Sequence, residues 1–331
     1  MRGAVIALVA GMGAAALACG GAGPPPLTQP QYAEPQWQDA FDATPELLLV
    51  VRPKALRRDK VYGPLLVRAI GLAAQQNRTV SAIHALDAIE DAEEVIVAVR
   101  ADVRGSDQPS ELVFVVRGVR ADIDPGHLVD ADGHKLWSVG PSGAVRELEG
   151  DSASAASLFE LPGRTWVIAT GDARMRARDA FAHPIRRPAM LVDPDALAIA
   201  RVDGPSLVAH AHALGSTGGL AAVGHKLQSA MIELPAGADG PEPRAAERDL
   251  RATLAYLDED AAALAELKLR AVIEALARSK RVGLAWLTSA RIERPSAQGK
   301  HLLVTAPLPP ALIDALLRAG SASLELDPAP H

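Results

Sequence analysis

Apolar residues from position 45 onward form two kinds of pattern. Short runs rich in β-branched residues and bounded by turn-forming residues predict strands, and apolar positions that recur every three or four residues predict helices. In the first half these patterns predict, in order, a strand at 46–52, helices at 62–76 and 81–90, strands at 93–100, 111–118, 134–139 and 144–148, a hairpin of 157–161 and 165–170, and a helix ending at 181.

The second half repeats this order of elements. The patterns predict a strand at 196–202, helices at 205–214 and 219–227, strands at 228–234 and 249–257, a long helix at 259–278, a hairpin of 290–294 and 300–306, and a closing helix at 309–318. A repeat on this scale indicates a duplicated domain and not a solenoid of short repeats. We therefore expect a first half at 45–183, a proline-marked linker at 184–194 and a second half at 195–327.

The helix predicted at 259–278 has the clearest pattern. Asp258 precedes it as an N-cap, and its first turn is acidic, as the helix dipole favours. Ala265, Leu269 and Val272 lie on one apolar stripe, which predicts packing on a sheet. Strand pairs followed by such helices predict an α+β fold, built as two tandem, similarly ordered halves of antiparallel strands with helices packed on one face.

The first eighteen residues have the pattern of an export signal. Arg2 is basic, and residues 4–18 contain no charged side chain. A basic start, an apolar run and small residues before a cut site are typical of a secretory signal peptide. Ala16-Leu17-Ala18 satisfies the cleavage rule of an ordinary secreted protein, and a retained transmembrane helix would need about 20 apolar residues. Both interpretations stand beside a third, which involves the next residue.

Ala16-Leu17-Ala18-Cys19 resembles the lipobox of bacterial lipoproteins, although that family prefers leucine at the position of Ala16. The resemblance implies that residues 1–18 are removed and that Cys19 carries lipid on its sulfur as the first residue of the mature chain. It also implies a protein anchored to the cell envelope. In that family aspartate after the cysteine keeps some lipoproteins at the inner membrane, so Gly20 permits an anchor in the outer membrane, facing the periplasm, in a Gram-negative cell.

The segment after the cysteine is rich in proline, glycine and glutamine. Such a composition buries too little apolar surface to fold, so residues 19–44 are predicted to be a disordered tether. Tyr32, Trp37 and Phe41 are unusual in a spacer, and they either dock on a partner or pack on the neighbouring domain. Residues 328–331 are predicted to be a disordered tail.

Composition narrows the classes of function. The 331 residues carry a formal net charge of −6, which disfavours nucleic acid as a partner. Cys19 is the only cysteine, so once its sulfur carries lipid the chain has no disulfide, no cysteine zinc site and no thiol nucleophile. Hydrophobic residues make up 49% of the chain and aromatic residues 3%, which predicts an aliphatic core and disfavours sugar binding on aromatic platforms.

Signatures of cofactor chemistry are weak throughout the sequence. Gly219 and Gly224 have the spacing of a phosphate-binding loop, but His225, Lys226 and Leu227 follow where that loop needs lysine and then serine or threonine. His210 and His212 would point to opposite sides of the predicted helix, which argues against a shared metal ion. We therefore predict no nucleotide, no metal and no other cofactor.

Basic residues gather in two clusters, one after the first strand and one in the helix that closes the first half. On an anchored protein they could contact an anionic surface, such as lipid headgroups or an acidic partner. A solvated face is the alternative interpretation. The candidates for this contact are Arg52, Lys54, Arg57, Arg58, Arg174 and Arg178.

Together these observations favour a membrane-anchored envelope lipoprotein that is not an enzyme and acts as a protein-binding or scaffold module. Its expected partners are the membrane, through Cys19, and another envelope protein. Two alternatives remain. An aliphatic chain with helices over a sheet could carry an apolar or lipid ligand in a cavity between the two layers. A hydrolase with a dispersed site would need a pocket with converging titratable groups.

Overall fold

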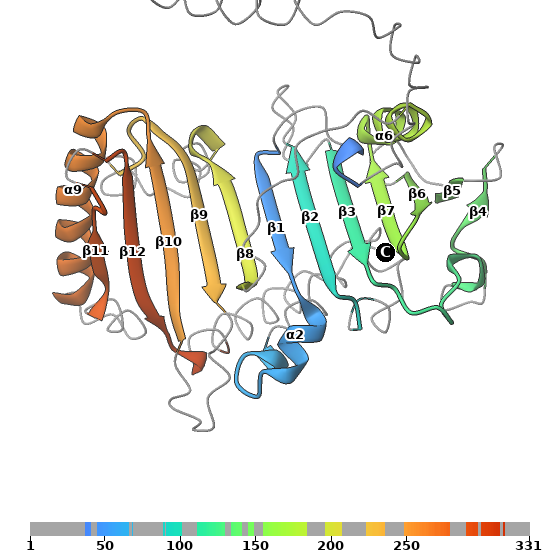
Figure 1. Cartoon of the computed structure of the whole chain (residues 1–331), viewed down its shortest axis with the longest axis horizontal. Coiled ribbons are helices and arrows are strands. Elements are labelled where there is room, and N and C mark those ends of the chain that lie inside the picture. Colours follow the sequence, from blue (N-terminus) through green and yellow to red (C-terminus); the bar gives the residue numbers. More distant parts are fainter. Residues whose placement is uncertain are drawn as a thin grey trace, which may run out of the picture. The chain divides into compact units, whose positions relative to one another are not determined.

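The structure is a computed structural model, and it describes the folded part of the chain with gaps (Figure 1). The export signal, Cys19, most of the predicted tether, the predicted linker and the predicted tail lie outside the described residues. So do most of the helices predicted at 62–76, 81–90, 205–214 and 309–318. The described residues are 37–40, 45–65, 68, 89, 91–100, 111–129, 134–140, 145–148, 155–183, 196–206, 223–235, 248–278, 289–296, 299–311 and 314.

The strands of the described residues form one 12-stranded sheet, in which neighbouring strands pair antiparallel. A few helices accompany the sheet, so the fold is of the mixed α+β class, as the sequence predicts. The strand order is β11-β12-β10-β9-β8-β1-β2-β3-β7-β6-β5-β4. The strands are β1 (Leu47–Val51), β2 (Glu94–Arg100), β3 (Glu111–Arg117), β4 (Ser138–Val139), β5 (Val145–Leu148), β6 (Ala156–Leu161), β7 (Thr165–Thr170), β8 (Ala196–Asp203), β9 (Leu227–Pro235), β10 (Arg248–Tyr256), β11 (Arg291–Glu293) and β12 (His301–Leu308).

The centre of the sheet is the pairing of β1 with β8. Leu49 of β1 lies opposite Ala200 of β8, and β1 pairs with β2 on its other side. Strands from residues before the predicted linker and strands from residues after it therefore share one hydrogen-bonded sheet. On one side of the β1–β8 pair the order is β1-β2-β3-β7-β6, and on the other it is β8-β9-β10-β12-β11.

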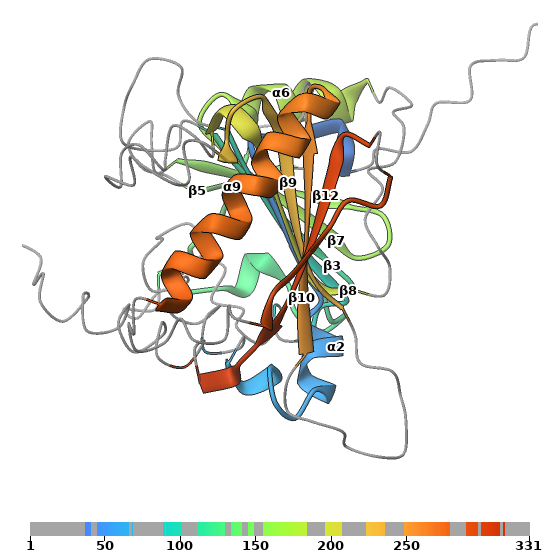
Figure 2. The ribbon, with the colours of Figure 1, turned by 90° about the vertical axis from the view of Figure 1, so that its left-hand side faces the viewer.

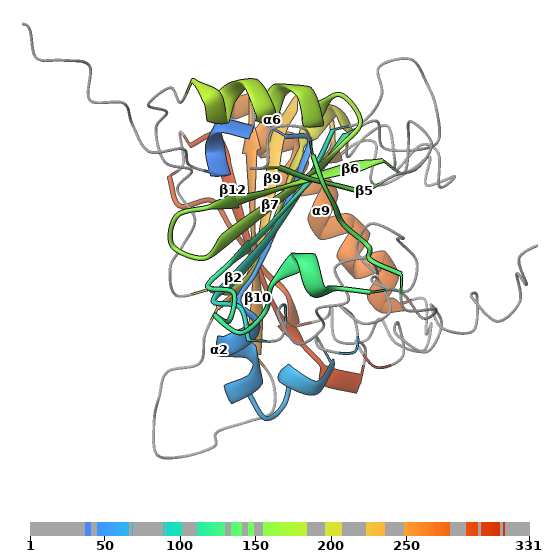
Figure 3. The same ribbon diagram turned by 90° about the vertical axis from the view of Figure 1, so that its right-hand side faces the viewer.

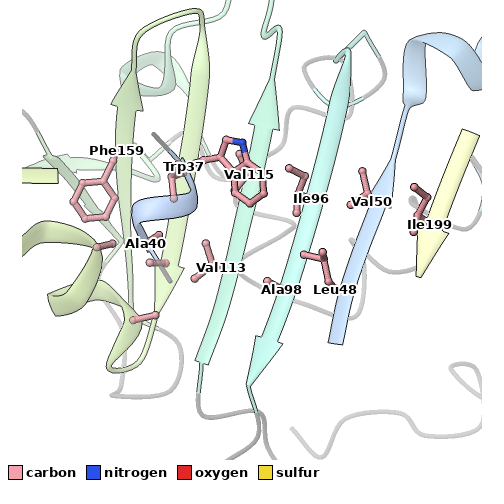
Figure 4. Packing of buried hydrophobic residues seen from close by; sticks show 14 of the residues in the cluster. Trp37, Ala40, Leu48, Val50, Ile96, Ala98, Val113, Val115, Phe159 and Ile199 are labelled. Carbon is pink, nitrogen blue, oxygen red and sulfur yellow. The ribbon is translucent and has the colours of Figure 1, made fainter. Parts of the chain in front are cut away.

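One face of the sheet is covered over β3 and β7 by α6 (Ala173–Ala182) and η2 (Trp37–Ala40), and we call it the α6 face. Side chains of β1, β2, β3 and β7 on this face form a buried cluster with the alanines of α6 (Figure 4). Phe181 of α6 meets Phe159 of β6 edge to face, with ring centroids 5.0 Å apart. The cluster includes Leu48, Val50, Ile96, Ala98, Val113, Val115, Val167, Ala169, Ala173 and Ala177.

The opposite face carries α9 (Glu259–Arg278), and we call it the α9 face (Figure 2). Ala262 and Ala265 of α9 pack with Leu302 of β12. Cross-strand pairing places Leu302 opposite Leu254, on the face away from Leu48. Asp258 caps the helix as predicted, because its carboxylate accepts the backbone N–H of Ala261 at 2.8 Å.

The helices therefore lie on both faces of the sheet (Figure 3). This differs from the expectation from the sequence, which placed the helices on one face. The physical reason is that the two halves carry their apolar side chains on different sides of the sheet. Val113 and Val167 pack with α6 on one face, whereas Leu254 and Leu302 pack with α9 on the other.

The end of the predicted tether belongs to the folded part of the chain. Trp37, at the start of η2, is 8% exposed and packs in the cluster of the α6 face, and Ala40 is buried with it. η2 contacts both α6 and β7. The folded part therefore begins at least eight positions before the predicted boundary at residue 45, because the indole adds apolar cover to β3 and β7.

Candidate functional site

The first basic cluster lies where β1 runs into α2 (Pro53–Arg58). Arg52 is largely buried. One terminal nitrogen of its guanidinium donates to the carbonyl oxygen of Ala196, and the other donates to a carboxylate oxygen of Glu94 at 3.3 Å. Arg57 pairs with Asp91 at 2.5 Å. Lys54 and Arg58 are exposed and have no ion pair among the residues that the structure describes.

The second basic cluster lies on α6, against the strand β5. Arg174 and Arg178 both pair with the carboxylate of Glu147, at 3.0 and 2.5 Å. The Ser157 hydroxyl donates to the same carboxylate at 2.7 Å and accepts from Arg174 at 3.1 Å. These contacts fix α6 on the sheet, because they join the helix to β5 and β6.

The six candidate cations do not form one basic surface. Four of them, Arg52, Arg57, Arg174 and Arg178, have carboxylate partners within the described fold. Their charges are partly neutralised, so their role in the described residues is to join elements. Contact with an anionic surface stays a prediction, and Lys54 and Arg58 are the residues whose exposure leaves them available for it.

A polar cluster that the sequence did not reveal lies between α2 and β10. Asp59, just after α2, accepts the backbone N–H groups of Val61 and Tyr62 at 2.9 and 2.8 Å, and its other oxygen pairs with Arg248 of β10. The Arg248 guanidinium lies 5.9 Å from the centre of the Tyr62 ring and donates to the carbonyl oxygen of Pro235 at 3.0 Å. Each of these side chains has a partner, so the cluster joins α2 to β9 and β10.

The sequence also did not reveal a polar area on one face of the sheet. On the α6 face of β8, β9, β10, β12 and β11, one row of directly opposed residues crosses five strands. Its two ends are exposed and its middle is half-buried, whereas the same row is buried from β1 to β6. From β11 to β6 the row is Glu293, Leu303, Thr253, Met231, Arg201, Leu48, Ala98, Val113, Ala169 and Ser157.

We call the part of the α6 face on these five strands the open surface. Its exposed charged residues are Arg201, Asp249, Arg251, Arg291 and Glu293, and it contains half-buried Met231, Thr253 and Leu303. These residues share one face because side chains alternate along each strand and because the strands pair in the observed register. A sequence signal exists in the charged residues of the runs at 249–257 and 290–294, but it does not tell which face they occupy.

Comparisons with known proteins identify no family for this chain: no family model, no curated protein and no solved structure matches it. Within the described ranges, no three His, Cys, Asp or Glu side chains are placed to hold a metal ion. The helices of that same part of the chain include none that is both long and apolar enough to cross a membrane.

Proposed function

We propose that the protein is a lipid-anchored component of a bacterial envelope that binds another protein through the open surface and has no catalytic role of its own. The proposed anchor is lipid on Cys19, supported by the lipobox-like Ala16-Leu17-Ala18 before it and the glycine- and proline-rich segment after it. Two or three acyl chains hold a protein at a membrane where one chain barely does. Gly20 after the cysteine permits the outer membrane in a Gram-negative cell.

We further propose that the two halves arose by duplication, and the pairing registers support this. In the first half Ile96 lies opposite Val115, and Val115 lies opposite Val167. At the matching positions of the second half Met231 lies opposite Thr253, and Thr253 lies opposite Leu303. Both halves keep this register from the central strand pair to the outer hairpin.

The observation that carries the binding role is the contrast between these matched positions. On the α6 face, Val113 of the first half corresponds to Arg251 of the second, and Phe159 corresponds to Glu293. The first of each pair is buried beneath α6 and η2, and the second is exposed. In the first half this face is buried in the core, and in the second half it faces outward. The outward face has a half-buried centre and a charged rim, as protein interfaces usually do.

Two measurements test the proposal. Metabolic labelling with a fatty acid, followed by mass spectrometry of the mature N-terminus, should find lipid on Cys19, and Cys19→Ser should abolish the label and release the protein from membranes. An unlabelled protein in the soluble fraction would refute the anchor.

The binding role is tested separately in whole cells. A photo-crosslinking amino acid at Thr253 should yield one discrete adduct. The same group at Lys268, which is exposed on α9 on the opposite face, is the matched control and should yield none. Equal crosslinking at both positions, or none at either, would refute the open surface as a binding site.

A further inference from the structure

The open surface has a self-complementary pattern of charged and apolar residues. Across it, directly opposed residues read Arg201, Met231, Thr253, Leu303 and Glu293. A cation and an anion stand at the two ends, an aliphatic side chain lies next inward on each side, and a small residue is at the centre. We propose that the partner bound at the open surface is a second copy of this chain, an inference that rests on the binding role proposed above.

A two-fold axis parallel to the strands and passing over Thr253 brings two such rows together in the opposite sense. Arg201 of one copy then faces Glu293 of the other, and Met231 faces Leu303, each contact occurring twice. This is the isologous contact of a two-fold dimer, in which one patch meets the same patch. Face-to-face sheets pack about 10 Å apart with their strands nearly aligned, which allows side chains of these sizes to meet.

The neighbouring row is compatible with this arrangement. Arg251 lies two residues from Thr253, on the same face, and would come near its own copy across the axis. It also lies directly opposite Glu233 within its own sheet. In each copy the carboxylate of Glu233 therefore lies beside Arg251 and offsets the repulsion between the two Arg251 side chains. Charge pairs across an interface chiefly set its register, and here they select the alignment over Thr253.

The rest of the fold restricts the contact to this half of the sheet. The α6 face of the first half is occupied by α6 and η2, which seal Val113 and Val167 from contact. With the axis over β10, the first half of the second copy extends beyond β11, away from α6 of the first copy. In this arrangement α6 and η2 of one copy therefore do not lie over α6 and η2 of the other.

Charge reversal tests the pairing without removing apolar surface. The protein, full-length and purified in detergent, should sediment as a concentration-dependent dimer. Arg201→Glu should weaken the dimer at least tenfold in dissociation constant, because Glu then faces Glu293. Glu293→Arg should do the same, and the double variant Arg201→Glu/Glu293→Arg should recover most of the affinity. Lys268→Glu, on the opposite face, is the matched control and should leave the constant unchanged.

Circular dichroism shows whether each variant is folded, which separates a lost contact from a lost fold. Both substituted residues are exposed, so the substitutions should leave the fold intact. A monomer at all concentrations would overturn the proposal. So would single variants that dimerise normally, or a double variant that stays as weak as the singles. If the self-pairing fails while Thr253 still crosslinks to a different protein in cells, the binding role stands and only the identity of the partner is wrong.

Discussion

The hydroxyl of Tyr62 donates a hydrogen bond to the carbonyl oxygen of Leu308, 2.5 Å away, and accepts one from the backbone N–H of Arg248 at 2.9 Å. Tyr62 follows α2, in the first half of the chain, whereas both partners belong to strands of the second. Its ring is completely buried. One side chain thus satisfies two polar backbone groups at the ends of β10 and β12, and it joins them to Asp59 through Arg248.

Tyr62→Phe should therefore lower the free energy of unfolding by about 1–3 kcal/mol, because it leaves a partly buried carbonyl and a partly buried N–H without their partner. Urea unfolding followed by circular dichroism measures the loss. Lys60→Ala, exposed in the same turn, is the control and should change the free energy by about 0.5 kcal/mol at most. A Tyr62→Phe variant as stable as the control would show that the bond contributes nothing to joining the halves.

The sequence predicted most of the strands because their signals are local. The runs at 111–118 and 165–170 are apolar, β-branched and flanked by turns, and they correspond to β3 and β7 within a residue. The long helix is confirmed with both ends, since Asp258 caps it and Glu266 pairs with Arg270 at 2.8 Å on its exposed side. Capping and i,i+4 pairing depend only on neighbours along the chain.

The sequence could not predict what depends on distant pairing. That β1 lies beside β8 rests on hydrogen bonds between residues far apart in the chain, and this pairing makes one sheet of the two halves. For the same reason the sequence could not decide whether Trp37 docks on a partner or packs on the domain, because a single aromatic residue after a proline-rich segment has no periodic pattern. The open surface was missed because Arg251 and Glu293 share a face only through Thr305 and Leu303, in the register of three strands.

Burial of Tyr256 predicts a dependence of stability on alkaline pH. Its hydroxyl donates to the carbonyl oxygen of Val223 at 3.0 Å, and burial raises the pKa of Tyr256 to about 12 from its ordinary value of 10.0. The folded state keeps this proton where the unfolded state has lost it. The contribution of the phenol is therefore complete below pH 10 and is lost as the pH rises toward 12.

Comparison with Tyr256→Phe isolates that contribution. Near pH 8 the variant should be less stable, because the carbonyl of Val223 loses its donor. The difference in unfolding free energy between the two proteins should then shrink steadily from pH 10 to pH 12, as measured by urea titrations at each pH. A difference that stays constant over this range would contradict the effect of burial on the phenol.

Arg270 of α9 occupies the outer edge of the sheet. It donates to the carbonyl oxygen of Ile292 at 2.7 Å and to the carboxylate of Glu266 at 2.8 Å. Ile292 lies in β11, the last strand on that side, and an edge strand with free carbonyl groups is a template for pairing with further chains. The guanidinium therefore covers this carbonyl group of the edge strand and hinders strand addition there.

Arg270→Ala should expose that edge and produce open-ended association, visible as species larger than a dimer in sedimentation and as turbidity that rises with concentration. Lys268→Ala, exposed on the same helix, keeps the edge covered and should behave as the unchanged protein does. Two-fold docking through the open surface stops at two copies, so the size of the species separates the two kinds of contact. If Arg270→Ala forms nothing beyond what the Lys268→Ala protein forms, β11 is protected by its short length alone and not by the arginine.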